Sequence, residues 1–407
     1  MGKRFIILQA IFLVAALIFV LAGCDSNDYP SSLYDPNAKT SSPAVISAVE
    51  PASVALSGVT LITFTGSNFS TVKEDNIVYF NAEKGTVVEA SATQLKVRAP
   101  IYVSDSIAIR IAVKNAEIFS NKWPYKLEAA QVNLLTFTPA EIPYGIATDA
   151  TGNVYASLVV SNAGAGVKIV TPGAEKYVDY APKGGETFWS AMKMGPGNVL
   201  YCARNLKGIF SIAAAATKPA TFVSSGLGTI YDLDFDVNHN LWGVGNNTDI
   251  YRIKPDKSIT KFPFTANLKS VRVYNGYLYV AGKKDGADKV WRFPFNGQDL
   301  GAVEEYFDFS AKVGGGYGVY CITFSADGYM YVGTDAPEAI FLVSPTGSYE
   351  PLYPGQFFPK TLLFAWGPGS NLYMTREQVL EGETIKYAQT IIRINTQKES
   401  APYYGLQ

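Results

Sequence analysis

Tyr144-Gly-Ile-Ala-Thr-Asp-Ala-Thr-Gly-Asn-Val-Tyr155 is the stretch that decides the fold, because its pattern returns along the chain. Close copies are Tyr231-Asp-Leu-Asp-Phe-Asp-Val-Asn-His-Asn-Leu-Trp242 and Tyr320-Cys-Ile-Thr-Phe-Ser-Ala-Asp-Gly-Tyr-Met-Tyr331, and weaker copies run over 189–201, 268–279 and 362–373. Each copy is an apolar strand, a turn rich in Gly, Asn or Asp, and a second strand with an aromatic end. The sequence therefore predicts a repeated β-hairpin.

A single hairpin cannot bury its own apolar face, so copies repeated at roughly 40–50 residues must stack on one another. Repeats of this length with several short strands are typical of β-propeller blades. The six copies predict an all-β, six-bladed propeller over 131–407. Two segments could supply the strand that closes the ring, 132–138 or Tyr403-Tyr404-Gly405. These repeats resemble the NHL family, which implies four antiparallel strands in each blade.

A second domain is expected over 43–128, where short alternating strands replace the repeat. An early proline, a glycine three residues before a core phenylalanine, and a proline at a strand end mark this segment. The early proline is Pro51, after a strand that begins near Ile46. The glycine and phenylalanine are Gly66 and Phe69, and the proline at the strand end is Pro100. The segment closely resembles the IPT/TIG family. That resemblance implies an immunoglobulin-like sandwich, and we expect it to act as a spacer or docking module.

The N-terminus has the features of a processing signal. Lys3 and Arg4 precede an apolar run, which ends in Leu21-Ala22-Gly23-Cys24. This order resembles the bacterial lipobox, and the resemblance implies a signal peptide over 1–23 and lipid attached to Cys24. Residues 24–42 are polar and predict a flexible tether. We expect anchoring at the outer membrane or cell surface through this lipid.

Composition removes several function classes. With 34 basic and 35 acidic residues the formal net charge is −1, which gives no electrostatic reason to expect a nucleic-acid partner. The one histidine, His239, aligns with Gly152 in the repeated turn, so a turn role is expected. Schemes that need a catalytic or metal-binding histidine lose their support. No metal or cofactor is expected, and the acidic turns near Asp149, Asp236 and Asp327 are interpreted as Asx turns.

Aromatic residues recur where the first strand of a blade begins. In a propeller these positions surround the mouth of the central channel, where ligands are expected. Sugar rings pack on Tyr and Trp while polar neighbours bind the hydroxyl groups, although such aromatics can also fill the space between blades. Phe188 could replace Trp189 because the turn that follows is irregular. The candidate ligand-binding residues are Tyr144, Trp189, Tyr231, Asp232 and Tyr320, together with Arg204, Asn246, Lys283 and Arg376 from neighbouring loops.

The arrangement of anchor, sandwich and propeller resembles surface lipoproteins associated with glycan uptake in Bacteroidota. That resemblance implies a non-enzymatic protein that captures a polysaccharide or oligosaccharide, with an outer-membrane transport protein as a possible partner. A protein–protein scaffold is the first alternative. A metal-dependent lactonase or lyase, as in gluconolactonase-like propellers, is the second, although Asp232 is the one acid at the aligned strand starts.

Overall fold

The computed structural model describes residues 40–182, 184–204, 206–214 and 216–404. The expected signal peptide, Cys24 and most of the expected tether therefore lie outside the described residues. The described chain is almost entirely β-structure, with one short helix, α2 (Phe309–Lys312), and two 3₁₀ turns, η1 (Lys73–Asp75) and η2 (Pro196–Asn198). No helix in this part of the chain is both long and apolar enough to cross a membrane.

The chain divides into two compact units, the first holding most of the residues up to Lys126 and the second holding Ala55–Thr60, Ile101–Val103 and the chain from Leu127 onward. The first unit is an eight-stranded sheet with the order β1-β3-β6-β5-β4-β7-β8-β2. Its strands are β1 (Val45–Glu50), β2 (Val54–Leu56), β3 (Leu61–Ser67), β4 (Asn76–Phe80), β5 (Glu83–Ala90), β6 (Gln94–Arg98), β7 (Ser104–Val113) and β8 (Trp123–Glu128).

The core of the first unit follows the alternation of its strands. On β7 every second residue, from Ile107 to Val113, is buried, as expected for a strand with one face in a core. Phe64 on β3 and Phe80 on β4 meet edge to face with ring centroids 6.5 Å apart, so the two halves of the sheet fold over each other. Gly66 has no room for a side chain, because a Cβ would lie 1.9 Å from the Val45 carbonyl oxygen.

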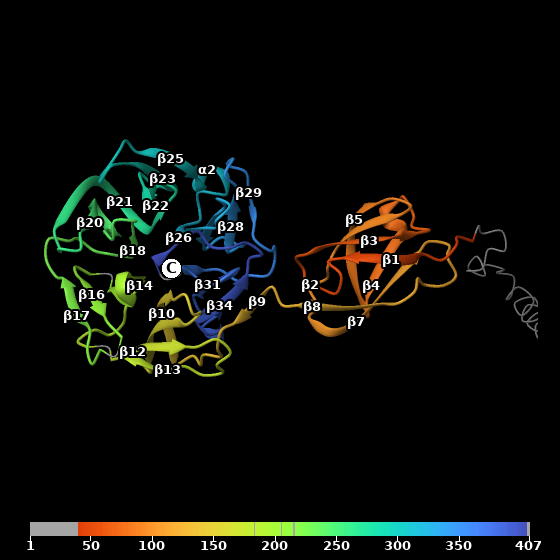
Figure 1. Ribbon diagram of the computed structural model, residues 1–407, viewed down its shortest axis with the longest axis horizontal. Helices are drawn as coiled ribbons and strands as arrows, with labels where there is room; N and C mark the ends of the chain where they lie inside the picture. Colours follow the sequence, from red (N-terminus) through yellow and green to blue (C-terminus); the bar gives the residue numbers. More distant parts are fainter. Residues whose placement is uncertain (1–39, 183, 205, 215, 405–407) are drawn as a thin grey trace, which may run out of the picture. The chain divides into compact units, whose positions relative to one another are not determined.

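The second unit is a propeller-like ring of antiparallel sheets, with β10, β14, β18 and β26 on its inner side (Figure 1). Three sheets have the orders β10-β11-β12-β13, β14-β15-β16-β17 and β26-β27-β28-β29. Their strands are β10 (Glu141–Thr148), β11 (Val154–Val160), β12 (Ala163–Val170), β13 (Val178–Ala181), β14 (Ala191–Gly195), β15 (Val199–Ala203), β16 (Ile209–Ile212), β17 (Ala220–Val223), β26 (Val319–Phe324), β27 (Met330–Thr334), β28 (Ile340–Val343) and β29 (Tyr349–Pro351).

The middle of the repeat forms one continuous sheet, where the sequence predicted two separate blades. Its 16-residue strand β21 (Ile259–Tyr274) pairs with β20 along its first part and with β22 along its second. The other strands of this sheet are β18 (Asp232–Phe235), β19 (Leu241–Val244), β20 (Asn246–Ile253), β22 (Tyr277–Lys284), β23 (Ala287–Asn296), β24 (Asp299–Leu300) and β25 (Glu304–Asp308). The count of six blades stays a prediction.

The first segment of the propeller closes the ring. β9 (Gln131–Asn133) pairs with β34 (Thr390–Asn395), which completes the sheet β30-β31-β34-β9. The remaining strands are β30 (Thr361–Trp366), β31 (Asn371–Arg376), and the hairpin of β32 (Val379–Glu381) and β33 (Thr384–Tyr387). Tyr403 and Tyr404 belong to no strand, and both line a small cavity at the centre of the ring. Of the two closing segments that the sequence left open, the N-terminal one is used.

The repeated turns are held by their own acidic residue. Asp149 accepts hydrogen bonds from the backbone N–H groups of Thr151 and Asn153, both at 3.0 Å. Asp236 does the same for Asn238 and Asn240. His239 occupies the left-handed region with φ 65°, where Gly152 has φ 87°. The interpretation of Asp149 and Asp236 as Asx turns, and of His239 as a turn residue, is confirmed.

Candidate binding site at the mouth of the channel

Four strands of the ring, β10, β21, β26 and β30, share an irregularity in their pairing. Pairing with the neighbouring strand skips Lys269 on β21, Tyr320 on β26 and Leu362 on β30, and on β10 it skips Tyr144 together with Gly145. Such bulges bend a strand locally and re-aim the side chain of the extra residue. The four skipped side chains meet at one end of the ring.

The skipped residues line a depression with a volume of about 340 Å³. We call it the mouth depression, and its lining residues are Tyr144, Phe188, Ser190, Tyr231, Lys269, Tyr320, Leu362 and Leu363. Every one of these residues is partly exposed. They come from β10, β21, β26 and β30 and from the residues just before β14 and β18, so the depression lies over the centre of the ring.

Aromatic rings dominate the wall of the depression. Tyr144 and Phe188 stack with ring centroids 4.2 Å apart and an interplanar angle of 21°. The ammonium group of Lys269 lies 4.5 Å from the centre of the Tyr231 ring. Tyr320 donates a hydrogen bond of 3.0 Å from its hydroxyl to Asp335, which fixes the orientation of its ring. The result is an apolar surface with a few polar groups, as small-molecule sites commonly have.

The charge in the depression is positive. Burial lowers the pKa of Lys269, and the nearby charge of Lys360 lowers it further, while Asp288 opposes the shift. Lys360 lies 4.3 Å from the centre of the Tyr320 ring and forms an ion pair with Glu377. Burial also raises the pKa of Tyr320 well above its usual value, and Asp335 adds to this effect. The Tyr320 hydroxyl is therefore a neutral group at physiological pH.

The structure corrects the prediction for Trp189. Its side chain is 1% exposed and packs in the core against Phe210, with ring centroids 5.0 Å apart. Phe188 occupies the place in the depression that the alignment gave to Trp189. The reason is local: the turn after β14 is the 3₁₀ turn η2, and this irregular turn shifts the alignment of the repeat by one residue. The sequence contained that signal, since the irregular turn already suggested Phe188.

The prediction for Asp232 as a ligand-binding residue is also wrong. The residue is 2% exposed, and its carboxylate forms an ion pair of 2.6 Å with Arg272. It also accepts hydrogen bonds from the Ser270 hydroxyl at 2.8 Å and the Val271 N–H at 3.0 Å. A carboxylate with all of these partners is a structural element of the channel wall, because it has no free face to offer a ligand.

The four loop residues lie away from the depression. Arg204 forms an ion pair with Glu186, and Lys283 forms one with Asp288 at 3.6 Å. Asn246 is exposed at the start of β20. Arg376 is buried and lines a different cavity. Of the predicted residues, the structure brings together Tyr144, Tyr231 and Tyr320 with the alternative Phe188, and it adds Ser190, Lys269, Leu362 and Leu363.

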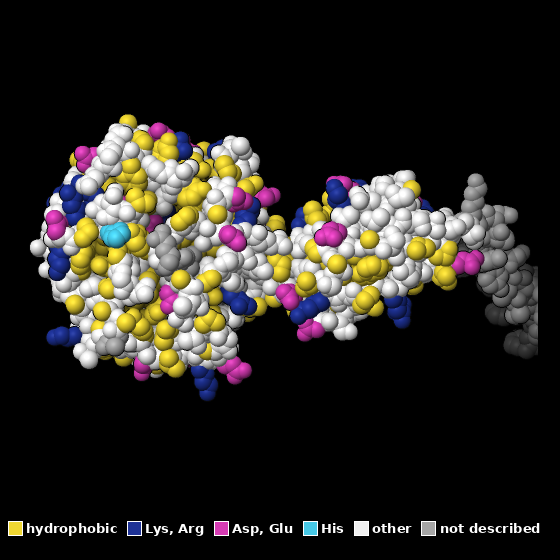
Figure 2. All heavy atoms as spheres, in the orientation of Figure 1, with side chains coloured by type: hydrophobic (Ala, Val, Ile, Leu, Met, Phe, Trp, Pro, Cys, Tyr) yellow, Lys and Arg dark blue, Asp and Glu magenta, His cyan; other side chains and the backbone are white. Residues whose placement is uncertain are grey.

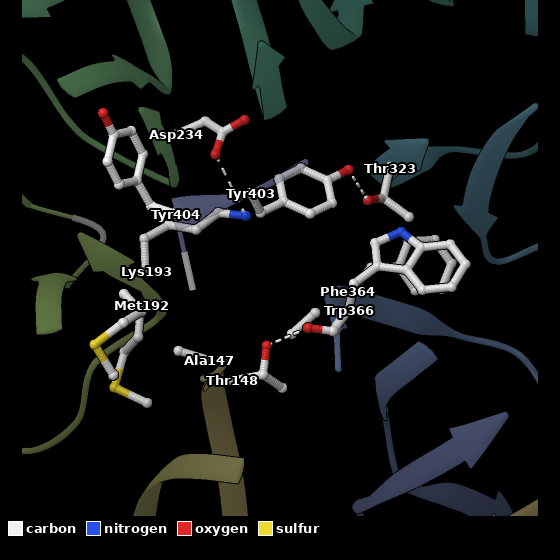
Figure 3. Close-up of a pocket in the computed structure, with 12 residues that line it drawn as sticks. Ala147, Thr148, Met192, Lys193, Asp234, Thr323, Phe364, Trp366, Tyr403 and Tyr404 are labelled. Carbon is white, nitrogen blue, oxygen red and sulfur yellow. Dashed lines mark hydrogen bonds and ion pairs between the residues drawn. The ribbon is translucent and has the colours of Figure 1, made fainter. Parts of the chain in front are cut away.

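Below the depression the channel is filled by side chains (Figure 3). Lys193 pairs with Asp234 at 3.6 Å, and the Tyr403 hydroxyl lies 2.7 Å from the Thr323 hydroxyl. Burial raises the pKa of Tyr403 to about 12. The cavity that remains has a volume of about 30 Å³, enough for a water molecule or two. A ligand larger than water is therefore confined to the mouth.

Metal binding has little support in the described residues. They contain no group of three or more His, Cys, Asp or Glu side chains placed to hold a metal ion. Asp232 is paired with Arg272, and Asp335 accepts hydrogen bonds from Tyr320 and the Gly318 N–H. Cys202 and Cys321 are both fully buried.

Acidic and basic side chains are interspersed on the face that Figure 2 displays.

Comparison with known proteins agrees with the fold. The IPT/TIG domain model matches residues 44–126, so the first unit contains an IPT/TIG domain. An auxiliary nutrient binding protein from Bacteroides thetaiotaomicron superposes with a TM-score of 0.50 at 11% identity, covering 89% of this chain and 98% of its own.

Two further structures are similar at lower scores. An auxiliary nutrient binding protein from Bacteroides ovatus gives a TM-score of 0.49 at 11% identity and covers 89% of this chain and 99% of its own. Virginiamycin B lyase from Staphylococcus aureus gives 0.47 at 15% identity and covers 65% and 98%. No curated protein matches the chain. At these identities the likeness concerns the fold.

Proposed function

We propose that this protein is a non-enzymatic, surface-anchored binder that captures a polysaccharide or oligosaccharide in the mouth depression. The observation that carries the proposal is the convergence of four bulged strands, together with Phe188 and Tyr231, on one partly exposed surface that holds four aromatic rings. A bulge costs regular pairing, and bulges in several strands that aim side chains at one place are expected at functional positions. Packing between blades would need these rings to be buried, whereas they are partly exposed.

The chemistry of the depression suits a sugar. The stacked pair of Tyr144 and Phe188 offers an apolar platform for the C–H face of a pyranose ring. Ser190, Lys269 and the Tyr320 hydroxyl stand beside it as groups able to bind hydroxyls. A volume of about 340 Å³ lies at the lower end of the range for small-molecule sites and fits one or two sugar residues of a longer chain.

The solved structure with a TM-score of 0.50 is described as an auxiliary nutrient binding protein, which supports a binding role for this fold. The proposed location comes from the sequence alone. Lipid on Cys24 would hold the chain at the outer membrane or cell surface, where a transport protein could receive the captured glycan. Growth with labelled palmitate should label the wild-type protein, whereas the Cys24→Ser variant should stay unlabelled.

Affinity electrophoresis through gels that contain a panel of polysaccharides tests the binding function. We expect at least one glycan class to retard the wild-type protein, and the Phe188→Ala and Tyr231→Ala variants to migrate freely. Tyr277→Ala is the matched control, because Tyr277 is a partly exposed aromatic residue next to the hairpin turn at the other end of the inner strands. Retardation of the two ring variants equal to that of the wild type would refute the proposed site.

A further inference from the structure

A second cavity lies beside β31 and β34, and two of its lining residues each carry a buried polar atom that has no partner among the described residues. Its volume is about 300 Å³, and we call it the Arg376 cavity. Its side chains include Phe137, Arg376, Lys386, Tyr387 and Thr390. None of them lines the mouth depression.

Arg376 is a buried cation. The residue is 6% exposed, and its guanidinium group donates one hydrogen bond of 2.7 Å to the Ala388 carbonyl. It also lies over the Tyr387 ring at 5.5 Å. Its Nε atom has no hydrogen-bond partner in the described part of the chain, and no described acid forms an ion pair with it. Burial lowers the pKa of Arg376, which reflects the cost of holding this charge away from water.

Thr390 stands directly opposite Arg376 across the β31–β34 ladder. Residues paired in this way point to the same face of a sheet and lie close together. Thr390 is 4% exposed, and its hydroxyl also has no partner among the described residues. Arg376 and Thr390, the residues that carry these two unpartnered atoms, therefore line the same cavity side by side.

Neighbouring acids do not compensate the charge. Glu377 pairs with Lys360, and Glu381 pairs with Lys386 at 3.1 Å. Glu141 accepts a hydrogen bond of 2.7 Å from Tyr177 and further hydrogen bonds from Thr138. A buried cation without a counterion is costly, and so is a buried donor left unpaired. Both costs fall when an anion with hydrogen-bond acceptors enters the cavity.

We propose that the Arg376 cavity binds the carboxylate of an acidic sugar residue. The guanidinium group and the Thr390 hydroxyl donate to the carboxylate oxygens, while Tyr387 and Phe137 supply the apolar wall for the sugar ring. The inference rests on the proposed function in one respect, which is that the ligand is a glycan. It adds that this glycan contains uronic acid residues. Lys269 in the mouth depression gives the second site the same preference for negative charge.

Isothermal titration of the purified protein with galacturonate, glucose and sodium acetate tests this proposal. We expect galacturonate to bind more tightly than either of the other two. Arg376→Gln should weaken galacturonate binding roughly ten- to hundredfold, as expected for the loss of hydrogen bonds to a charged group. Arg393→Gln is the control, because Arg393 is exposed on the same strand as Thr390 and does not line the cavity.

Thr390→Val keeps the test decisive if Arg376→Gln unfolds. It removes an unpaired hydroxyl and keeps the shape, so the protein should stay folded and bind galacturonate roughly two- to tenfold more weakly. Unchanged binding in Thr390→Val and Arg376→Gln would overturn the assignment, and so would equal affinity for acetate. A wild-type protein that does not bind galacturonate would overturn it as well. The Phe188→Ala variant separates the two proposals, because it should lose polysaccharide retardation and keep the Arg376-dependent binding of galacturonate.

Discussion

Replacing Asp232 by asparagine should destabilise the propeller without any ligand present. The Asp232 and Arg272 side chains are 3% and 1% exposed, and their charged atoms lie 2.6 Å apart. Neutralising the acid leaves the Arg272 cation buried, and asparagine cannot reproduce all of the hydrogen bonds from Ser270 and Val271. Breaking one side of a buried ion pair costs about 3–5 kcal/mol. For a domain of this size that loss lowers the melting temperature by roughly 6–20 °C.

Differential scanning calorimetry of the purified variant measures this loss. Glu304→Gln is the control, because its ion pair with Arg292 is 44% and 30% exposed and should contribute about 1 kcal/mol or less. The double variant Asp232→Leu/Arg272→Met should recover most of the stability, since it removes both buried charges. A loss below about 1 kcal/mol for Asp232→Asn would show that Arg272 does not depend on Asp232 as its buried counterion. Reduced glycan binding at unchanged stability would return Asp232 to the ligand site.

Three further predictions concern other buried groups. Trp189→Ala should cost about 3–5 kcal/mol in the free energy of unfolding in urea, because it removes a large core side chain; a loss near zero would mean that the ring is not in the core. Burial raises the pKa of Asp149, but hydrogen bonds from Thr151, Asn153 and Tyr155 outweigh this and lower it overall. Because the folded pKa lies below the unfolded value, the stabilisation by Asp149 is present above about pH 4 and is lost as the pH falls further. Asp149→Asn should therefore flatten the acid side of a curve of stability against pH. An unchanged curve would contradict this role for Asp149. Tyr403→Phe should lower the free energy of unfolding by about 0.5–1.5 kcal/mol, because it removes the hydrogen bonds of the Tyr403 hydroxyl with Thr323 and Phe324. Equal melting temperatures for Tyr403→Phe and the wild type would show that these hydrogen bonds do not stabilise the fold.

Local chemistry made the architecture predictable from sequence. The Asp149 and Asp236 turns bond to their own backbone, so their residues report the hairpin directly. The IPT/TIG domain could also be predicted from the sequence, because Gly66 and Phe69 occupy positions with a fixed steric or packing role. Ring closure could not be predicted in this way, because β9 and β34 pair although they lie at opposite ends of the propeller sequence. Nothing local to either strand indicates that pairing.

The candidate site could be predicted only in part. The aromatic residues at the strand starts were visible, and Tyr144, Tyr231 and Tyr320 do meet. The bulges at Tyr144 and Tyr320 were not visible, because a bulge depends on pairing with the next strand. The partner of Asp232 lies 40 residues away on another strand, so its burial could not be read from neighbouring residues. Arg376 was chosen as a loop residue, whereas it ends β31 and is buried.

Glycan capture in the mouth depression is tested by comparing how polysaccharide gels retard the wild-type protein and the Phe188→Ala variant. We expect a glycan to retard the wild type, the Phe188→Ala variant to migrate freely, and both proteins to melt at the same temperature. Equal retardation of the two proteins would contradict the claim that the mouth depression is the binding site. A wild-type protein that no polysaccharide retards would contradict glycan capture itself.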